Sequence, residues 1–331
     1  MTAPRSDAEF VTEKFRRHLA ELAARERRET APPQPEVFAA MRALAARARF
    51  LPLRGVLHHV YEHGPADGPA VILLHGWDCS SYWFYRLAPA LGDQGFRVVA
   101  FDFRGHGFSD SAADERYDLP TLAQDALALA DALGIREFSL ASFSLGSAVA
   151  LLVGAQAPER VRRHIVMNFG LFGYGALQSR LLPSILTTLF DTLRRIPSKA
   201  LVYRYVSATL CQREVTWRDV EMCFTSLVHC DSRAAFLAVT DLVTPERAAH
   251  LRQAAATAAP TLVIAGEFDP VASLADSERL ARTLPAAQLH ILLRTGHLVL
   301  FERPDEIERL AQAWLKRGTT LPESRTKRHE R

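Results

Sequence analysis

Cysteine is scarce in this sequence, and the few copies form no recognisable framework. They are Cys79, Cys211, Cys223 and Cys230. None belongs to a C-x-x-C pair, and no histidine stands at the spacing of a zinc finger, which excludes a disulfide scaffold and a structural zinc site. A chain with this cysteine usage is typical of a reducing compartment. We therefore expect a cytoplasmic protein that holds no metal.

A strong charge of one sign is also missing. The net charge is only +3, and residues 316–331 alone carry six basic and two acidic side chains, a local charge of +4. The rest of the chain is therefore nearly neutral, which argues against nucleic acid as its main partner. We expect the basic end, residues 317–331, to be a disordered tail.

Long apolar runs are absent as well. No stretch reaches the ~20 apolar residues that a transmembrane helix requires, so we expect no membrane span. Residues 1–29 are rich in charge and lack the apolar segment of an export signal. Helical patterns at 7–29 and 36–49 lead us to interpret residues 1–50 as a helical extension. It would pack on its own chain or on a second copy, so a homodimer through the first helix is one partner that we consider.

Short apolar runs that alternate with helical patterns make up much of the sequence, of which 48% is hydrophobic. The runs that predict strands are residues 56–61, 70–74, 97–101, 137–141, 163–169, 261–265 and 288–293. Most of them are continuously apolar, as strands are when both faces of their sheet are covered. The alternation predicts an α/β fold with a mainly parallel sheet covered by helices on both faces.

One region interrupts the alternation, because residues 171–259 show only helical patterns. These patterns cover residues 181–193, 199–210, 217–230 and 233–242. A helical block between two strands predicts an insertion over the functional edge of the sheet, that is, a cap. The core would then consist of residues 51–170 and 260–316.

Apolar side chains crowd the start of this insertion, and we predict that most of them form the core of the cap. They are Phe172, Tyr174, Leu181, Leu182, Ile185, Leu186, Leu189 and Phe190. The same apolar entrance favours a small-molecule substrate that is hydrophobic or acylated.

A serine stands where a strand gives way to a helix, within residues 138–150. Strand, sharp turn and helix together place Ser144 at the apex of the turn, with its hydroxyl above the edge of the sheet. The turn needs small residues two positions before and after the apex, where Ser142 and Gly146 stand. The usual pattern, G-x-S-x-G, has glycine in place of Ser142. Ser142 is also the competing nucleophile, although Gly146 then lies four residues away instead of two.

A serine hydroxyl is a weak nucleophile, so Ser144 needs a base and a group that orients the base. In open α/β sheets the reacting groups gather at the carboxyl ends of the strands. One later strand runs into Asp269 and the next runs into His297. Asp241 is the alternative orienting acid, but Asp269 is preferred because it follows a strand directly.

Five short motifs together resemble those of the α/β-hydrolase superfamily. They are His75-Gly76-Trp77, Asp102-x-Arg104-Gly105-His106-Gly107-x-Ser109, the turn at Ser144, Gly266-x-x-Asp269, and Gly296-His297 followed by Glu302-x-Pro304. Each motif alone is weak, but all five occur in this order between residues 56 and 315. The resemblance implies an α/β-hydrolase fold with a helical cap.

The resemblance also implies roles for individual residues. Ser144 would be the nucleophile, His297 the general base and then acid, and Asp269 the group that orients it. The backbone N–H groups of Trp77 and Leu145 would form the oxyanion hole.

Supporting positions follow from the same motifs. They are His75, Gly76, Ser142 and Gly146. Asp102, Arg104 and His106 would connect a loop to the core rather than react. The Gly-x-Gly within that loop lacks the third glycine of a dinucleotide fingerprint, so we expect no cofactor.

These residues predict a serine hydrolase that cleaves an ester or thioester of a hydrophobic substrate through an acyl-serine. An aspartate at the apex of the turn would instead have indicated epoxide or halide chemistry. The same residues would also serve acyl transfer or elimination of a carboxylate, which differ from hydrolysis in the access of water. A third reading is a non-catalytic member that only binds a ligand, and the complete set of Ser144, Asp269 and His297 argues against it.

Overall fold

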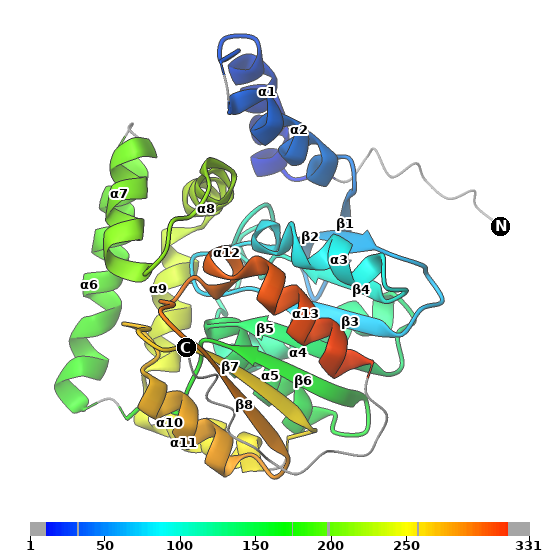
Figure 1. Ribbon diagram of the computed structural model, residues 1–331, viewed down its shortest axis with the longest axis vertical. Coiled ribbons are helices and arrows are strands. Elements are labelled where there is room, and N and C mark those ends of the chain that lie inside the picture. Colours follow the sequence, from blue (N-terminus) through cyan, green and yellow to red (C-terminus); the bar gives the residue numbers. More distant parts are fainter. Residues whose placement is uncertain (1–10, 32, 174, 197–198, 257, 317–331) are drawn as a thin grey trace.

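A single sheet runs through the computed structural model, which describes residues 11–31, 33–173, 175–196, 199–256 and 258–316. The strands are β1 (Ala48–Leu53), β2 (Val56–His63), β3 (Ala70–Leu74), β4 (Arg97–Phe101), β5 (Phe138–Phe143), β6 (Val161–Met167), β7 (Thr261–Gly266) and β8 (Ala287–Leu292). Within the described residues these eight strands pair in the order β1-β2-β4-β3-β5-β6-β7-β8 (Figure 1). From β4 to β8 neighbouring strands are parallel, whereas β2 is antiparallel to both β1 and β4.

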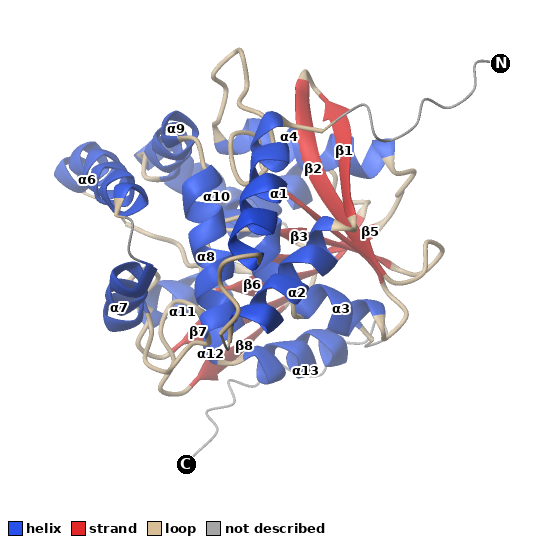
Figure 2. Ribbon diagram, turned by 90° about the horizontal axis from the view of Figure 1, so that it is seen from above, coloured by secondary structure: helices blue, strands red, loops and turns tan. Residues whose placement is uncertain are grey.

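Helices cover both faces of this sheet, as the continuous apolar strands predict. Side chains alternate between the faces, so in β3 Val71 and Leu73 join one core while Ile72 and Leu74 join the other. The helices on the first face are α3 (Leu87–Gly92) and α13 (Pro304–Leu315), and those on the second are α4 (Leu119–Ala132), α5 (Leu145–Gln156) and α11 (Leu274–Thr283). Figure 2 shows the two helical layers on either side of the strands. The predicted α/β class is confirmed.

Two short elements complete the core. The 3₁₀ helix η2 (Ser81–Phe84) precedes α3. The single-turn helix α12 (Val299–Glu302) precedes α13.

The first strand departs from the predicted helical extension, residues 1–50. The second helix, α2 (Gln34–Ala45), ends early, and β1 then forms an antiparallel hairpin with β2. Arg54 and Gly55 both have positive φ in the turn, which suits a tight hairpin. β1 lies at the edge of the sheet, where Pro52 is tolerated although it has no N–H to donate. The helical part of the predicted extension therefore ends before β1 begins at Ala48.

The first helix, α1 (Glu13–Glu26), buries its apolar face on its own chain. The Phe15 ring lies 5.2 Å, centroid to centroid, from each of the rings of Phe50 and Phe108. At the start of the helix, Thr12 Oγ1 donates a hydrogen bond to Phe108 O at 2.7 Å. Because this face is already covered, a second copy is not needed to bury it, and the homodimer stays a prediction.

A buried carboxylate connects α1 to two helices of the insertion. Glu221 of α8 (Trp217–His229) accepts a hydrogen bond from Arg25 Nη1 at 2.5 Å. It also accepts from Lys199 Nζ at 2.6 Å, at the start of α7 (Lys199–Leu210). One acidic side chain thus holds three helices together.

The insertion contributes four helices that stand beside the sheet, and we call these helices the cap. They are α6 (Ala176–Arg195), α7, α8 and α9 (Ser232–Leu242). A fifth helix, α10 (Pro245–Ala256), belongs elsewhere, because Leu251, Ala254 and Ala255 pack in the same core as α5 and α11. The predicted insertion, residues 171–259, therefore ends in a helix that covers the sheet.

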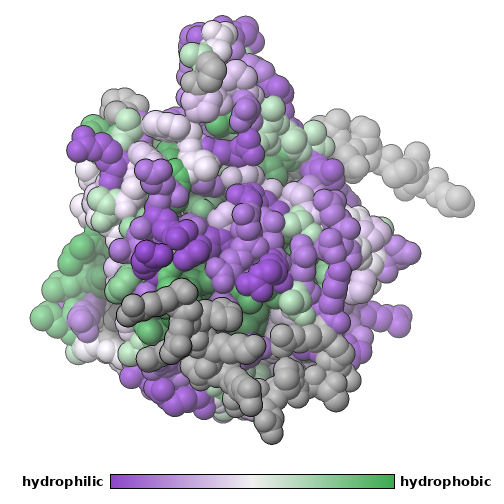
Figure 3. All heavy atoms as spheres, viewed as in Figure 1, coloured by the Kyte–Doolittle hydropathy of each residue, from purple (hydrophilic) through white to green (hydrophobic). Residues whose placement is uncertain are grey.

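The outer face of α6 differs from the prediction. Leu177, Leu181 and Ile185, spaced four residues apart, are 69%, 46% and 59% exposed. Figure 3 shows the apolar side chains that gather over α6 at the left of the view. Leu181 and Ile185 were predicted to be cap core, but this face of the helix points away from its neighbours.

None of the helices in the described residues is both long enough and apolar enough to cross a membrane.

Candidate active site

A single residue makes the turn between β5 and α5. β5 ends at Phe143 and α5 begins at Leu145, so the turn falls on Ser144. Its backbone has φ 51° and ψ −124°, a conformation that strains any residue with a side chain. The Ser144 N–H donates to Met167 O at 2.9 Å, and the Ser147 N–H donates to Ser144 O at 2.8 Å. Ser144 stays partly exposed while both neighbours are buried, as the predicted strand-to-helix turn requires.

Close approach of the backbones explains the small residues around Ser144. A Cβ on Gly146 would lie 2.3 Å from Leu74 O, so glycine is required there. Two residues before the apex, Ser142 is fully buried. Its hydroxyl donates to Ile165 O at 3.0 Å and lies 3.0 Å from Ser147 Oγ. The hydroxyl of Ser142 is thus occupied in holding β5 to β6 and α5, which does not favour it as the competing nucleophile.

The two residues predicted after later strands are in direct contact. His297 Nδ1 lies 2.8 Å from Asp269 Oδ2 and 2.9 Å from Oδ1. Asp269 Oδ1 also accepts from the N–H groups of Val271 and Ala272, at 2.7 and 2.9 Å. The Asp269 carboxylate is therefore fixed and buried, and it orients the imidazole through Nδ1–H. This leaves His297 Nε2 as the nitrogen that is available to take or give a proton.

Two further residues hold the loop that carries His297. Asn168, just after β6, donates through Nδ2 to the carbonyl oxygens of Gly296 and His297, both at 2.9 Å. Glu302 accepts from the N–H groups of Gly296 and Leu298, at 3.0 and 3.2 Å. Sequence reasoning quoted Glu302 only as part of a motif and missed Asn168. The predicted strand, residues 163–169, included Asn168, whereas β6 ends at Met167 and Asn168 has a positive φ of 48°, which asparagine tolerates.

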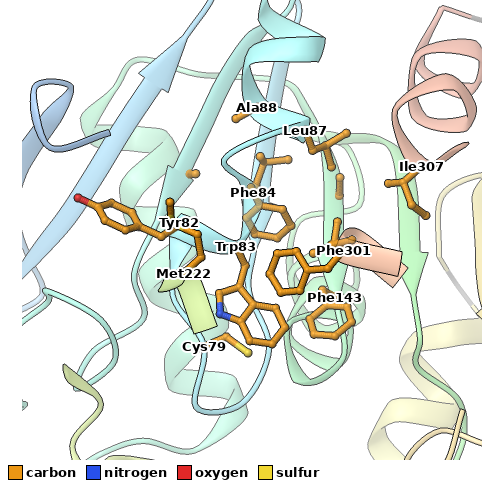
Figure 4. Close-up of a cluster of buried hydrophobic side chains, with 14 of the residues drawn as sticks. Cys79, Tyr82, Trp83, Phe84, Leu87, Ala88, Phe143, Met222, Phe301 and Ile307 are labelled. Carbon is orange, nitrogen blue, oxygen red and sulfur yellow. The ribbon is translucent and has the colours of Figure 1, made fainter. Parts of the chain in front are cut away.

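Aromatic rings connect the serine turn to the histidine. The Phe143 and His297 rings lie 5.1 Å apart, centroid to centroid. Trp83 packs on Phe143 at 5.4 Å and on Phe301 at 4.9 Å. These side chains meet in one buried cluster between the sheet and the cap (Figure 4). Trp83 Nε1 donates to Ser226 Oγ of α8 at 3.1 Å, which extends the cluster into the cap.

The predicted oxyanion donors follow β3 and begin α5. Leu145 is the first residue of α5, and the first N–H groups of a helix have no acceptor within the helix. Trp77 is partly exposed after β3. Just before Trp77 in the chain, His75 Nδ1–H donates to Gly76 O at 2.8 Å, and His75 Nε2 accepts from the Phe103 N–H at 3.0 Å. Burial lowers the pKa of His75 to about 4, so it is a neutral support for this loop.

The charged loop after β4 is held in the interior, as predicted for a structural segment. Asp102 accepts from the N–H groups of Ser81 and Phe108, at 2.6 and 2.8 Å. Arg104 makes two hydrogen bonds to the buried Asp125 carboxylate, at 2.5 and 2.7 Å. Its neighbour His106 is also buried.

The alternative orienting acid lies in another network. Asp241 Oδ2 accepts from the Leu119 N–H at 2.8 Å and from Arg247 Nε at 2.9 Å. These contacts hold the end of α9 against α4 and α10. Asp269, not Asp241, is bonded to His297.

Comparison with known proteins agrees with this arrangement. The family described as alpha/beta hydrolase fold matches residues 69–304. The chain belongs to the α/β-hydrolase family. It is similar to the magnesium-chelatase 30 kDa subunit of Rhodobacter capsulatus, at 29% identity over 83% of this chain and 95% of that one. A putative carbamate hydrolase of Variovorax paradoxus is 30% identical over 72% of this chain and 88% of that one.

Solved structures show the same fold. A hydrolase from Pseudomonas aeruginosa has a TM-score of 0.68 and 25% identity, covering 82% of this chain and 100% of that one. The two predicted ends of this α/β-hydrolase, residues 1–50 and 317–331, lie outside the residues that the family matches, and residues 317–331 also lie outside the described residues.

A cleft of about 480 Å³ opens beside the loop that carries Asp269. Its lining comes from the loop after β6 and from α6, α10 and α11. Val271, two residues after Asp269, lines it, but Ser144, Asp269 and His297 do not.

In the described part of this α/β-hydrolase, no three His, Cys, Asp or Glu side chains are grouped as metal ligands.

Proposed function

We propose that this α/β-hydrolase is a serine hydrolase that cleaves an ester or thioester of a hydrophobic substrate through an acyl-serine. One observation carries the proposal, the hydrogen bond between His297 Nδ1 and the buried Asp269 carboxylate. A histidine held in this way has the tautomer that a general base needs, with Nε2 free to accept a proton. Ser144 supplies the matching nucleophile on a strained turn, and the Phe143 ring beside it touches the His297 ring.

The first half of the reaction forms the acyl-serine. Ser144 Oγ attacks the acyl carbon while its proton passes to His297 Nε2. The carbonyl oxygen becomes negative and accepts hydrogen bonds from the N–H groups of Trp77 and Leu145. The bond to the leaving alcohol or thiol then breaks, and His297 returns the proton to the leaving atom.

The second half consumes water. His297 Nε2 takes a proton from a water molecule, whose oxygen attacks the acyl carbon. The same two N–H groups hold the second oxyanion, Ser144 Oγ leaves with the proton, and a carboxylic acid is released. A carbamate, the substrate class in the name of the Variovorax relative, has an acyl carbon that would follow the same steps.

A fluorophosphonate probe tests the nucleophile. It should phosphonylate Ser144, as peptide mass spectrometry would report, and Ser144→Ala should abolish labelling. Ser142→Ala is the matched control, since it removes the neighbouring hydroxyl and should leave labelling intact. Modification at Ser142, or an unlabelled Ser144 in correctly folded protein, would contradict the assignment.

A substrate panel tests the reaction class. Turnover of p-nitrophenyl esters of rising acyl length, beside one acyl-thioester, should increase with acyl length. Asp269→Asn should lower kcat by about 10⁴-fold because it fixes the wrong imidazole tautomer. Product analysis with and without added alcohol or amine acceptors separates hydrolysis from acyl transfer. Transfer products that predominate over free acid would replace the hydrolytic proposal.

A further inference from the structure

Two consecutive residues of the loop after β3 are held by the cap. Trp77 Nε1 donates to Ala235 O of α9 at 2.7 Å. The Trp77 ring also meets the Phe190 ring of α6 edge to face, with centroids 4.7 Å apart. The next residue, Asp78, accepts from Arg194 Nη2 of α6 at 2.7 Å. The Trp77 N–H therefore lies in a segment whose side chains make hydrogen bonds and a ring contact with the cap helices.

Arg194 is the centre of these contacts. Its Nε donates to Leu227 O of α8 at 2.7 Å, and its Nη1 donates to Ser232 Oγ at the start of α9, also at 2.7 Å. A fourth partner, Asp191, lies one turn earlier on α6. A guanidinium is suited to this arrangement because its donors are fixed in one plane. One side chain thus joins three cap helices to the loop after β3.

Stability alone does not account for the pair of Asp78 and Arg194. Asp78 has a positive φ of 55° and a fully buried side chain. Burial raises the pKa of Asp78 to about 6, against the opposing effect of Arg194, and Asp191 and Cys230 are the other titratable groups facing it. A raised pKa means that the protein holds the ionised carboxylate less favourably than water does. The desolvation cost of a buried ion pair can exceed its Coulombic gain, so the presence of this pair is weak evidence for a role in stability.

We propose that Arg194 is a positioning residue. Through Asp78, it couples the position of the cap to the position of the Trp77 N–H. The oxyanion hole of this enzyme is then complete only when the cap is docked. The inference rests on the proposed function, because it requires the Trp77 N–H to be an oxyanion donor. Small displacements are sufficient for a large effect, since a shift of about 1 Å in a catalytic group can cost about 10²-fold in rate.

Three variants separate this role from a merely structural one. Arg194→Gln removes the cation, and Asp78→Asn removes the charge while keeping the side-chain volume. Arg195→Gln is the matched control, because Arg195 is the next residue on α6 and is exposed. Each variant is measured for kcat and KM on a p-nitrophenyl ester. Each is also titrated with a trifluoromethyl ketone, whose serine adduct carries an oxyanion, and with the corresponding methyl ketone.

The expected signature is confined to the oxyanion. Arg194→Gln and Asp78→Asn should lower kcat by about 10- to 100-fold and should weaken binding of the trifluoromethyl ketone by the same factor. KM and binding of the methyl ketone should change less than about twofold, since neither depends on an oxyanion. Arg195→Gln should match the wild type in all four quantities.

Other outcomes overturn the inference. Variants that raise KM and leave kcat and trifluoromethyl ketone binding unchanged would show that the pair only shapes the cap. If Arg194→Gln does not fold, as judged by circular dichroism, Asp78→Asn decides the question alone. A wild type that does not react with a fluorophosphonate at Ser144 would overturn the proposed function together with this inference. A reactive wild type with unaffected variants would overturn this inference alone.

Discussion

Asn168 follows β6 with a positive φ and directs its amide toward the loop that carries His297. The amide satisfies two buried carbonyl oxygens, those of Gly296 and His297, that have to stay in place for the imidazole to face Asp269. Its own Oδ1 accepts from the Gly266 N–H at 3.3 Å, which links the ends of β6 and β7. Asn168 is therefore a residue through which the sheet fixes the histidine.

We predict that Asn168→Ala lowers kcat/KM by about 10- to 100-fold, because the loop that carries His297 loses two hydrogen bonds and a shift of about 1 Å in a catalytic group can cost about 10²-fold in rate. Ester turnover, with the rate of fluorophosphonate labelling at Ser144, measures the effect. Asn168→Asp is the harsher control, since it replaces the donor by a carboxylate facing two carbonyls. Full activity of both variants would show that the loop is held without Asn168.

Ser142 is the residue in which this chain departs from the usual glycine. Its hydroxyl donates to Ile165 O and contacts Ser147 Oγ in the interior. We predict that Ser142→Ala lowers the free energy of unfolding by about 1 kcal/mol, the net worth of an ordinary buried hydrogen bond. kcat/KM should stay within about threefold. Urea unfolding and ester turnover measure the two effects, and a large loss of turnover in a stable variant would assign Ser142 a part in the chemistry.

At the scale of elements, the buried Glu221 carboxylate connects three helices, α1, α7 and α8. Glu221→Gln would leave Arg25 and Lys199 close together with no carboxylate between them. We predict a loss of about 1–3 kcal/mol in the free energy of unfolding, below the usual cost for a fully buried pair because both cations are partly exposed. Urea unfolding at neutral pH measures it. The matched control, Glu36→Gln, removes the partner of Arg218 in an exposed pair and should change stability by less than about 0.5 kcal/mol.

The elements differ in how well the sequence predicts them, and the reason is burial. The central strands, such as 70–74 and 261–265, are continuous apolar runs because both faces of the sheet are covered. β1 escaped prediction because it is an edge strand with exposed positions and a proline, directly after a helix. α10 was included in the predicted insertion because its sequence is mostly alanine and polar residues, and nothing local states which layer it joins.

The candidate site divides in the same way. Ser144, Asp269 and His297 could be predicted because each follows a strand, and strand ends are visible in an apolar pattern. Asn168 and Arg194 act on carbonyl groups and carboxylates that are distant in sequence, so no local pattern identifies them. Leu181 and Ile185 were wrongly predicted to be buried. Helical spacing of apolar residues predicts an apolar face, but it does not reveal whether another helix packs against that face.

At the scale of the whole molecule, the interior holds several histidines that stay neutral. Burial lowers the pKa of His18 and His106 to about 3, and those of His75, His164 and His229 to about 4. The unfolded chain binds protons at these positions below about pH 6.5, whereas the folded chain does so only near pH 4 or, for His18 and His106, near pH 3. Stability is therefore fully present above pH 6.5 and is lost as the pH falls toward 4.

We predict that the free energy of unfolding decreases as the pH falls from 6.5 to 4, because the unfolded chain gains protons at these histidines before the folded chain does. His164→Leu should remove one of these contributions, since neither ring nitrogen of His164 has a hydrogen-bond partner among the described residues. Urea unfolding across this pH range measures the slope. A stability that does not vary with pH would contradict the prediction.

The docking of α1 has a consequence for biosynthesis. Thr12 bonds to a residue 96 positions further along the chain, and Arg25 bonds to one 196 positions further along. At a synthesis rate of about 5–20 residues per second, the second partner is made about 10–40 s after Arg25. The Phe15 ring on the apolar side of α1 meets two of its partners earlier, once Phe50 and Phe108 have been synthesised. α1 is therefore synthesised before the segments that hold it, and chaperones can bind its apolar side in that interval.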